Sequence, residues 1–274
     1  MAEDNEFLTD VDFGQYRTLI YNESGIHFTS TNRSILESRL KERLREKGLD
    51  SPRSYYLLIS KNSEELKDFL DSVTTNLTHF FRNDAHFKAL ENFVIPELLK
   101  IKQGTPNPTL KVWSAGCSTG EEPYSIAMLM SEILPPPGRF EIVASDISLK
   151  SLMEGRKGFY GDARIEGIPE GYLRKYCTRL EGGYQFKPEI MGKIRFDYHN
   201  LKHDSGQRNV DLVLCRNVII YFDEVAQLEV IKRFWEVMAP KSFLFIGHSE
   251  SLFGMDTKFE FVKTQWATFY RKYI

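Results

Sequence analysis

The chain has 274 residues and a mass of 31.9 kDa, enough for one large α/β domain or for a catalytic domain with a small companion, which excludes a miniprotein. Hydrophobic residues make up 42% and charged residues 27%, a composition typical of a globular protein with a core rather than of a disordered chain. Because the net charge is only -2, the chain as a whole has no attraction to nucleic acid, and we expect no nucleic-acid partner.

The cysteines and the N-terminus indicate the compartment. Cys117, Cys177 and Cys215 are far apart and outside any C-x-x-C pattern, which argues against a disulfide framework and against a metal site. Residues 1–12 are acidic and do not resemble an export signal. No apolar run approaches the roughly 18 residues of a membrane span, so we expect a cytoplasmic protein without membrane insertion.

The first part of the chain predicts helices. Leucines recur at helical spacing, as in Leu36, Leu40 and Leu44, and no alternating strand is present, so we expect an N-terminal helical domain over residues 1–75. From Thr109 the pattern changes to short apolar runs separated by amphipathic segments, which is typical of parallel βα units. We therefore expect a second, α/β domain, with its linker, over residues 76–274.

The second domain contains seven predicted strands and one insertion. The strands are Leu110–Trp113, Phe140–Ala144, Ile194–Phe196, Leu212–Cys215, Phe243–Ile246, Phe259–Val262 and Thr268–Arg271. Helices are predicted over Pro123–Leu134, which stops at the proline-rich residues 135–138, and over Asp223–Met238. Residues 176–187, with two glycines in the middle, predict an inserted antiparallel hairpin.

A strand that enters a small-residue turn and then a helix is the most informative stretch. It covers residues 112–124, and Gly116 and Gly120 let a ligand approach the backbone closely. The spacing matches neither the G-x-G-x-x-G of dinucleotide folds nor a P-loop. Two glutamates, the second of them Glu122, open the helix and would repel phosphate, which favours a nucleoside ligand with a positive charge. A capping box between Thr119 and Glu122 is the alternative explanation.

Polar side chains also follow two other strands. Asp146 ends the next strand, where a carboxylate can accept both ribose hydroxyls, although in isolation it would more often be a helix N-cap. Arg216, Asn217 and Tyr221 follow the buried strand that begins near Asp211. They are expected to face the ligand crevice, which in an open parallel sheet lies at the carboxyl ends of the strands. A surface ion pair for Arg216 and a core position for Tyr221 are the alternatives.

Taken together, the motifs closely resemble the chemotaxis receptor methyltransferases, the CheR family. The resemblance extends from about Phe13 to the C-terminus, and the segments that carry it are Thr75–Arg82, Gly116–Gly120, Ala144–Asp146, Tyr198–Leu201, Cys215–Asp223 and Gly247–Leu252. It implies an S-adenosylmethionine-dependent O-methyltransferase that esterifies glutamate side chains on the cytoplasmic helices of chemoreceptors. The implied fold is an all-helical N-terminal domain joined to a Rossmann-like class I methyltransferase domain, with an antiparallel β-subdomain at about 166–198.

The resemblance also implies a cofactor site for S-adenosylmethionine, with S-adenosylhomocysteine as the product. The corresponding residues here are Asn76, Thr78, Arg82, Glu122, Asp146, Asn200, Leu201, Arg216 and Asn217. Glu122 would balance the methionine ammonium group, and Asp146 would hold the ribose. Asn200 and the backbone of Leu201 would read the adenine edge.

The implied acceptor determines whether the enzyme needs a general base. A glutamate side chain with an ordinary pKa near 4.3 is ionised at neutral pH, so its attack on the methyl group needs no general base. Catalysis should come from alignment, with the carboxylate oxygen about 3 Å from the methyl carbon. In the family, Arg82 and Tyr221 correspond to residues beside the methyl group; we expect Arg82 to orient the carboxylate or the methionine end of the cofactor. A helix-surface charge is the alternative for Arg82.

A glutamate-rich receptor helix needs a basic docking site. Residues 33–47 contain six basic and three acidic residues, and Arg39 and Arg43 lie one turn apart beside the leucine stripe. We expect this helix to bind the receptor, with a solvated amphipathic helix as the alternative. Some family members also bind a receptor C-terminal pentapeptide through the β-subdomain, but the hairpin between Tyr176 and Phe196 is short, which argues against tethering here.

A serine hydrolase is the main competing interpretation. Residues 116–120 satisfy G-x-S-x-G, and Ser118, Asp211 or Asp223, and His248 occur in hydrolase order. Against it, a hydrolase elbow follows several strands, whereas the chain before this turn is mostly helical. His248 could equally order its loop or border the crevice.

A binding module that only senses S-adenosyl ligands is a second alternative. Such a module would keep the cofactor residues and lose the acceptor site. The presence of both Arg82 and Tyr221 argues against it.

Overall fold

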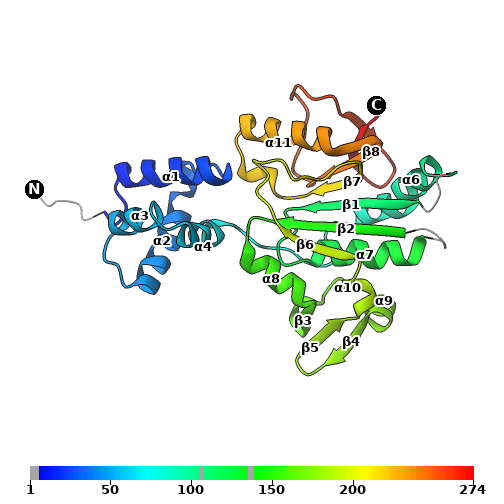
Figure 1. Cartoon of the computed structure of the whole chain (residues 1–274), viewed down its shortest axis with the longest axis horizontal. Helices are drawn as coiled ribbons and strands as arrows, with labels where there is room; N and C mark the ends of the chain where they lie inside the picture. Colours follow the sequence, from blue (N-terminus) through cyan, green and yellow to red (C-terminus); the bar gives the residue numbers. More distant parts are fainter. Residues whose placement is uncertain (1–5, 105–107, 135–138) are drawn as a thin grey trace, which may run out of the picture. The chain divides into compact units, whose positions relative to one another are not determined.

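The computed structural model describes residues 6–104, 108–134 and 139–274, which form two compact units (Figure 1). One unit contains the chain up to Thr75 together with Tyr221–Ala226, and the other contains Asn76–Ile220 and Gln227–Ile274. Within the described ranges, no helix has both the length and the apolar character that a membrane crossing requires.

The first unit is helical, as predicted. Its elements are α1 (Asp10–Ser24), the 3₁₀ turn η1 (Ser30–Asn32), α2 (Arg33–Lys47), α3 (Pro52–Ile59) and α4 (Ser63–Val73). Helix α4 starts at Asn62, whose side chain accepts hydrogen bonds from two backbone N–H groups, as an N-cap should. The stripe of Leu36, Leu40 and Leu44 is buried in the core of this unit, so α2 packs through its apolar face.

A seven-stranded mixed sheet forms the centre of the second unit. Its strand order is β6-β2-β1-β7-β8-β10-β9. The strands are β1 (Thr109–Ala115), β2 (Arg139–Asp146), β6 (Ile194–Tyr198), β7 (Val210–Cys215), β8 (Met238–Ile246), β9 (Glu260–Lys263) and β10 (Thr268–Lys272). The strands from β6 to β8 are parallel and β10 is antiparallel to β8, so all seven predicted strands are present.

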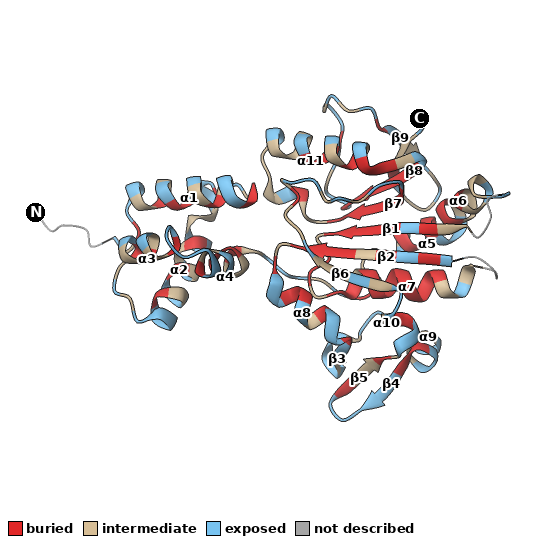
Figure 2. Ribbon diagram, in the orientation of Figure 1, coloured by how far each residue is buried: buried red, intermediate tan, exposed pale blue. Residues whose placement is uncertain are grey.

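Helices cover both faces of this sheet (Figure 1). They are α5 (Asp84–Ala89), the π-helical turn η2 (Leu90–Val94), α6 (Ile95–Ile101), α7 (Glu121–Ile133), α8 (Leu149–Lys157) and α11 (Glu224–Val237), with the 3₁₀ turn η4 (Ile219–Tyr221) after β7. Side chains alternate along β1: Val112 joins the core shared with α5 to α7, while the ring of Trp113 lies 5.2 Å from that of Phe234 in α11. Figure 2 shows β7 buried along its whole length, as expected of a central parallel strand. The predicted stop of the α7 segment at 135–138 lies outside the described residues.

A separate three-stranded antiparallel sheet lies in the chain between β2 and β6. Its strand order is β3 (Phe159–Gly161), β5 (Gly183–Phe186) and β4 (Cys177–Leu180), accompanied by η3 (Asp162–Arg164), α9 (Glu170–Tyr176) and α10 (Pro188–Met191). The predicted hairpin is therefore confirmed as β4 and β5. The small sheet starts before residue 166, because β3 joins it, and the segment 194–198 is strand β6 of the large sheet instead.

Candidate cofactor site

The turn after β1 is held in an unusual backbone conformation. Gly116 and Gly120 have φ angles of +82° and +95°, which favour glycine, and a Cβ atom at Gly116 would overlap the Val218 side chain. The backbone N–H groups of Gly116 and Cys117 both donate to the carbonyl of Ser145, at 2.8 and 2.9 Å. These hydrogen bonds fix the turn to the carboxyl end of β2. Because its glycines have no side chains, a ligand can approach the backbone of the turn closely.

Asp146 lies at this junction and is 8% exposed. Its Oδ2 accepts a hydrogen bond from the backbone of Ser118 at 2.7 Å, and its Oδ1 accepts one from Ser148 at 2.8 Å. The N-cap of α8 is Ser148, so the N-cap explanation for Asp146 is wrong. An ionised carboxylate has about four lone-pair sites, so Asp146 has the capacity to accept ribose hydroxyls as well.

Glu122 and Arg216 form a buried ion pair at the same edge of the sheet. Glu122 Oε2 lies 3.1 Å from Arg216 Nη1, and Glu122 Oε1 accepts from the Ser114 hydroxyl at 2.7 Å. The N-cap of α7 is Gly120 without a side-chain hydrogen bond, so the capping-box explanation is wrong. The side chain of Arg216 is only 3% exposed, which also excludes a surface ion pair. Burial lowers the pKa of Arg216, and the Glu122 carboxylate opposes that shift.

The segment from Asn76 to Arg82 lies against these groups. The carbonyl of Asn76 accepts from the Ser118 hydroxyl at 3.2 Å, and the carbonyl of Arg82 accepts from Arg216 Nη2. The guanidinium of Arg82 donates to the Leu77 carbonyl at 3.0 Å. Arg82 precedes α5 and is half-buried, so it is not a helix-surface charge. Thr78 is half-buried in the same segment.

The remaining expected cofactor residues follow β6 and β7. The backbone of His199 donates to the Asp146 carbonyl at 3.0 Å, which brings the neighbouring Asn200 and the buried Leu201 to the end of β2. Asn217 has a φ of +60°, a left-handed conformation that asparagine tolerates better than most residues. All nine expected cofactor residues are thus in the second unit, whereas Tyr221, Arg39 and Arg43 are in the first.

The small sheet contributes contacts to the cofactor turn that the sequence did not predict. The hydroxyl of Tyr160 donates to the carbonyl of Thr119 at 2.6 Å. Arg164 donates to the Thr119 hydroxyl at 2.7 Å and pairs with Glu121, which is 1% exposed. These contacts join residues more than 40 positions apart, and no local pattern could have indicated them.

The hydrolase interpretation is not supported. The Ser118 hydroxyl donates to the carbonyl of Asn76 rather than to a histidine, and His248 is exposed. Burial raises the pKa values of Cys117 and Cys215 well above the ordinary value, so these thiols stay protonated. In the described part of the chain, no cluster of histidine, cysteine, aspartate or glutamate is suited to hold a metal ion.

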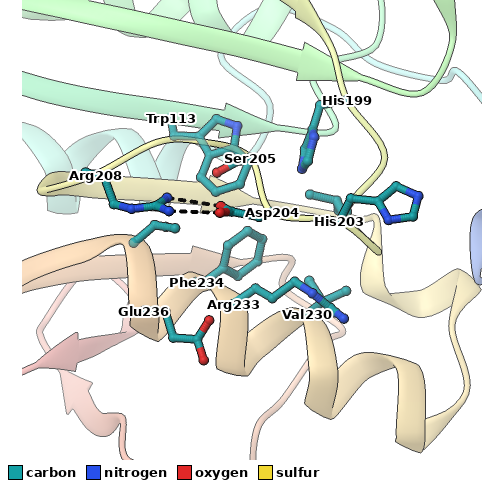
Figure 3. Close-up of a pocket in the computed structure, with 12 residues that line it drawn as sticks. Trp113, His199, His203, Asp204, Ser205, Arg208, Val230, Arg233, Phe234 and Glu236 are labelled. Carbon is teal, nitrogen blue, oxygen red and sulfur yellow. Dashed lines mark hydrogen bonds and ion pairs between the residues drawn. The ribbon is translucent and has the colours of Figure 1, made fainter.

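A cavity of about 210 Å³ lies between α11 and the loop that joins β6 to β7 (Figure 3). Trp113 and Phe234 form its apolar wall, and the ring of His199 points into it. Of the expected cofactor residues, only Leu201 lines this cavity. Neither Asp146 nor Glu122 lines this cavity.

His86, in α5 behind Arg216, predicts acid sensitivity. It is 4% exposed, and burial, followed by the charges of Arg216 and His248, lowers its pKa from 6.5 to about 3. Below pH 6.5 the unfolded chain binds a proton at His86, whereas the folded chain leaves His86 neutral until about pH 3. The free energy of unfolding should therefore fall from pH 6.5 towards pH 3 by about 1.4 kcal/mol per pH unit. Denaturant unfolding at pH 7 and pH 5 should therefore show an extra loss of about 2 kcal/mol in wild type compared with His86→Phe. The exposed His203, changed to Phe, is the control and should keep the wild-type pH dependence; an equal dependence in His86→Phe would refute the assignment.

The fold and this site define an S-adenosylmethionine-dependent methyltransferase: parallel strands in a mixed sheet, a glycine turn after β1, and the carboxylates of Glu122 and Asp146 at the same edge of the sheet. A family model described as "CheR methyltransferase, SAM binding domain" matches residues 76–268. A second model, described as "CheR methyltransferase, all-alpha domain", matches residues 11–74. The chain therefore belongs to the CheR methyltransferase family, and the implied class I methyltransferase domain with its helical N-terminal domain is confirmed.

Curated relatives match over most of their length. A protein of Vibrio cholerae named chemotaxis protein methyltransferase 2 is 32% identical over 97% of this chain and 94% of its own. The chemotaxis protein methyltransferase of Borreliella burgdorferi is 33% identical over 90% of both chains, and that of Escherichia coli is 36% identical over 92% of this chain and 88% of its own.

Proposed function

We propose that this protein is a cytoplasmic protein-glutamate O-methyltransferase that acts on chemoreceptors. The observation that carries the proposal is that both domains match the family in order, including the helical unit, which holds none of the nine expected cofactor residues. A helical unit that matches the family model and holds none of the expected cofactor residues is explained if it recognises the acceptor. The relatives' names, chemotaxis protein methyltransferases, agree with such an acceptor.

The residues at the sheet edge suit S-adenosylmethionine, which supplies an electrophilic methyl group when bound. Glu122 would take the ammonium group, because its carboxylate lies at this edge of the sheet and has lone pairs beyond those that accept from Arg216 and Ser114. Asp146 would take the ribose hydroxyls. Asn200 and Leu201, fixed to the end of β2 by the neighbouring His199, would hold the adenine. The other members of the proposed site are Asn76, Thr78, Arg82, Arg216 and Asn217.

The acceptor side needs orientation rather than a base, because the attacking glutamate is already ionised. We assign Arg82 to orient the acceptor carboxylate or the methionine end of the cofactor, and Tyr221 to line the methyl group. Neutralisation of charge as the carboxylate and the sulfonium react favours a site with little water, which agrees with the burial of Arg216 and Asp146.

The reaction is tested by incubating the purified protein with methyl-labelled S-adenosylmethionine and a chemoreceptor cytoplasmic fragment. Label should enter the fragment as a base-labile methyl ester and should be lost when the modified glutamates are changed to alanine. A fragment that remains unlabelled by a protein that binds S-adenosylhomocysteine would point to an acceptor outside chemotaxis.

Helix α2 is the proposed receptor-binding element, and its two arginines differ. The side chain of Arg39 is 42% exposed, and among the described residues its only ion pair is with Glu42 at 3.6 Å, on the same helix. Arg43 is 13% exposed and belongs to a buried network with Tyr55 and Glu65. Arg39 is therefore free to meet an acidic partner, while Arg43 also stabilises the helical unit.

Reversing the charge at Arg39 should weaken receptor binding without affecting the cofactor. In Arg39→Glu, we expect the KM for the receptor fragment to rise about fivefold or more, because a like charge would face an acidic helix, with S-adenosylhomocysteine affinity unchanged. Arg53→Glu, the same charge change at an exposed position of α3, is the matched control. A KM that is equal in the two variants would exclude α2 as the docking helix. Arg43→Glu is unsuitable, since it would place a like charge beside the buried Glu65.

We propose that this protein does not tether to a receptor pentapeptide, because its β4–β5 hairpin, which turns at Glu181 and Gly182, is short. We expect receptor fragments with and without their C-terminal pentapeptide to be methylated at the same rate. A KM at least tenfold lower for the fragment that has the pentapeptide would show that the hairpin tethers.

A further inference from the structure

The carboxylate of Glu250 accepts hydrogen bonds from backbone N–H groups of two separate loops. Its Oε2 accepts from Asn217 at 3.0 Å and from Gly247, and its Oε1 accepts from Val218 at 3.0 Å and from Ile220 at 3.2 Å. Three of these donors are in the loop that follows β7, and the fourth directly follows β8. One side chain therefore joins the carboxyl ends of two neighbouring parallel strands.

The surrounding backbone is shaped for this carboxylate. A Cβ atom at Gly247 would overlap Glu250 Oε2 and would lie 2.8 Å from the Asn217 nitrogen, so only glycine fits there. Asn217 has a φ of +60°, a conformation that costs a non-glycine residue of order 1 kcal/mol or more unless the surroundings hold it. The N–H groups of residues 217, 218 and 220 point to one spot, where a single anionic acceptor satisfies all of them.

We propose that Glu250 is a positioning residue for methyl transfer, which it serves by fixing the loop from Asn217 to Ile220. This inference rests on the proposed function, in which Asn217 contacts the cofactor and Tyr221, the next residue after Ile220, lines the methyl group. Glu250 acts through these residues and itself contacts neither reactant. It also fixes the backbone next to Arg216, whose guanidinium holds Glu122 and the Arg82 carbonyl.

The role requires a carboxylate and not merely a polar side chain. A glutamine at position 250 would keep one acceptor oxygen, but its NH₂ group would face backbone N–H groups that are also donors. At least one pair of the four hydrogen bonds would then be lost, and the strained conformation of Asn217 would lose its support. The expected result is a mobile loop in an otherwise folded protein.

The experiment compares Glu250→Gln with wild type by hydrogen exchange of the ligand-free protein and by calorimetric titration with S-adenosylhomocysteine. We expect the amides of residues 217–220 to exchange at least tenfold faster and the Kd for S-adenosylhomocysteine to rise at least tenfold. Glu65→Gln is the matched control: it removes a 4% exposed carboxylate from a structural network in the helical unit. It should lower the melting temperature without changing either readout.

The outcomes separate this inference from the proposed function. Exchange and Kd both within twofold of wild type would overturn the inference, as would faster exchange with an unchanged Kd. If Glu250→Gln does not fold, Glu250→Asp, which keeps the charge on a shorter side chain, should show the same two effects at smaller size; unchanged values in that variant would overturn the role. Failure of wild type to bind S-adenosylhomocysteine would instead refute the cofactor site. Hydrogen exchange in the ligand-free protein would still show whether Glu250 fixes the loop from Asn217 to Ile220.

Discussion

Replacing Arg82 with alanine should lower kcat for methyl transfer by at least about 100-fold, equivalent to about 2.7 kcal/mol of transition-state stabilisation. The guanidinium is the charged group assigned to align the reactants, and misalignment is costly in a reaction that depends on orientation. The contact that Arg82 makes with Arg216 uses its main-chain carbonyl, which alanine keeps. The substitution therefore removes the guanidinium and its bond to the Leu77 carbonyl while the rest of the site is retained.

Steady-state transfer of labelled methyl groups to a receptor fragment measures this effect. Lys88→Ala is the control, because Lys88 is an exposed cation of the adjacent helix and, in the part of the chain that the structure describes, forms an ion pair only with Asp84. It should retain turnover within twofold. Turnover of Arg82→Ala as fast as that of Lys88→Ala would remove Arg82 from the catalytic machinery.

Loss of the Asp146 carboxylate should abolish measurable cofactor binding. Asp146→Ala removes two hydrogen bonds from the N–H groups of Ser118 and Ser148, and it removes the acceptor that we propose for the ribose. Hydrogen bonds to a charged group contribute about 1.5–3 kcal/mol each, so the Kd for S-adenosylhomocysteine should rise by at least about 100-fold.

Calorimetric titration is the direct measurement for this variant. Glu141→Ala provides the control within the same strand, since the side chain of Glu141 on β2 is exposed and forms an ion pair with Lys111 at 3.7 Å. Its affinity should equal that of wild type. Tight binding by Asp146→Ala would require a different ribose site.

The large sheet could be predicted from the sequence because its strands are short segments rich in apolar residues, separated by turns and amphipathic helices. Strand β3 could not, because Phe159–Gly161 is too short to show an alternating pattern and forms only by pairing with β5. Neither could the π-helical turn Leu90–Val94 between α5 and α6, since no helical pattern distinguishes it from the α-helix around it.

The same division between local and long-range information holds for the site. Glu122 and Asp146 could be identified as ligand candidates because strand, turn and helix follow one another in the chain. Their local alternatives, a capping box and an N-cap, are decided by where the helices start in the structure, with Gly120 and Ser148 as the N-caps. The partner of Glu122, Arg216, is 94 positions away in the chain. Glu250 is 33 positions from Asn217, and no spacing rule relates a carboxylate to the backbone of another loop.

The base and the tip of the small sheet differ in how well they should tolerate substitution. At its base, Tyr160 and Arg164 hold the cofactor turn, so substitutions there would alter the chemistry of the enzyme. At its tip, Glu181 and Gly182 are exposed, and a side chain added at Gly182 would meet nothing within 4 Å. The φ of +76° at Gly182 still favours glycine, so the tolerant changes at the tip are substitutions of Glu181 and insertions, which should leave the cofactor turn in place.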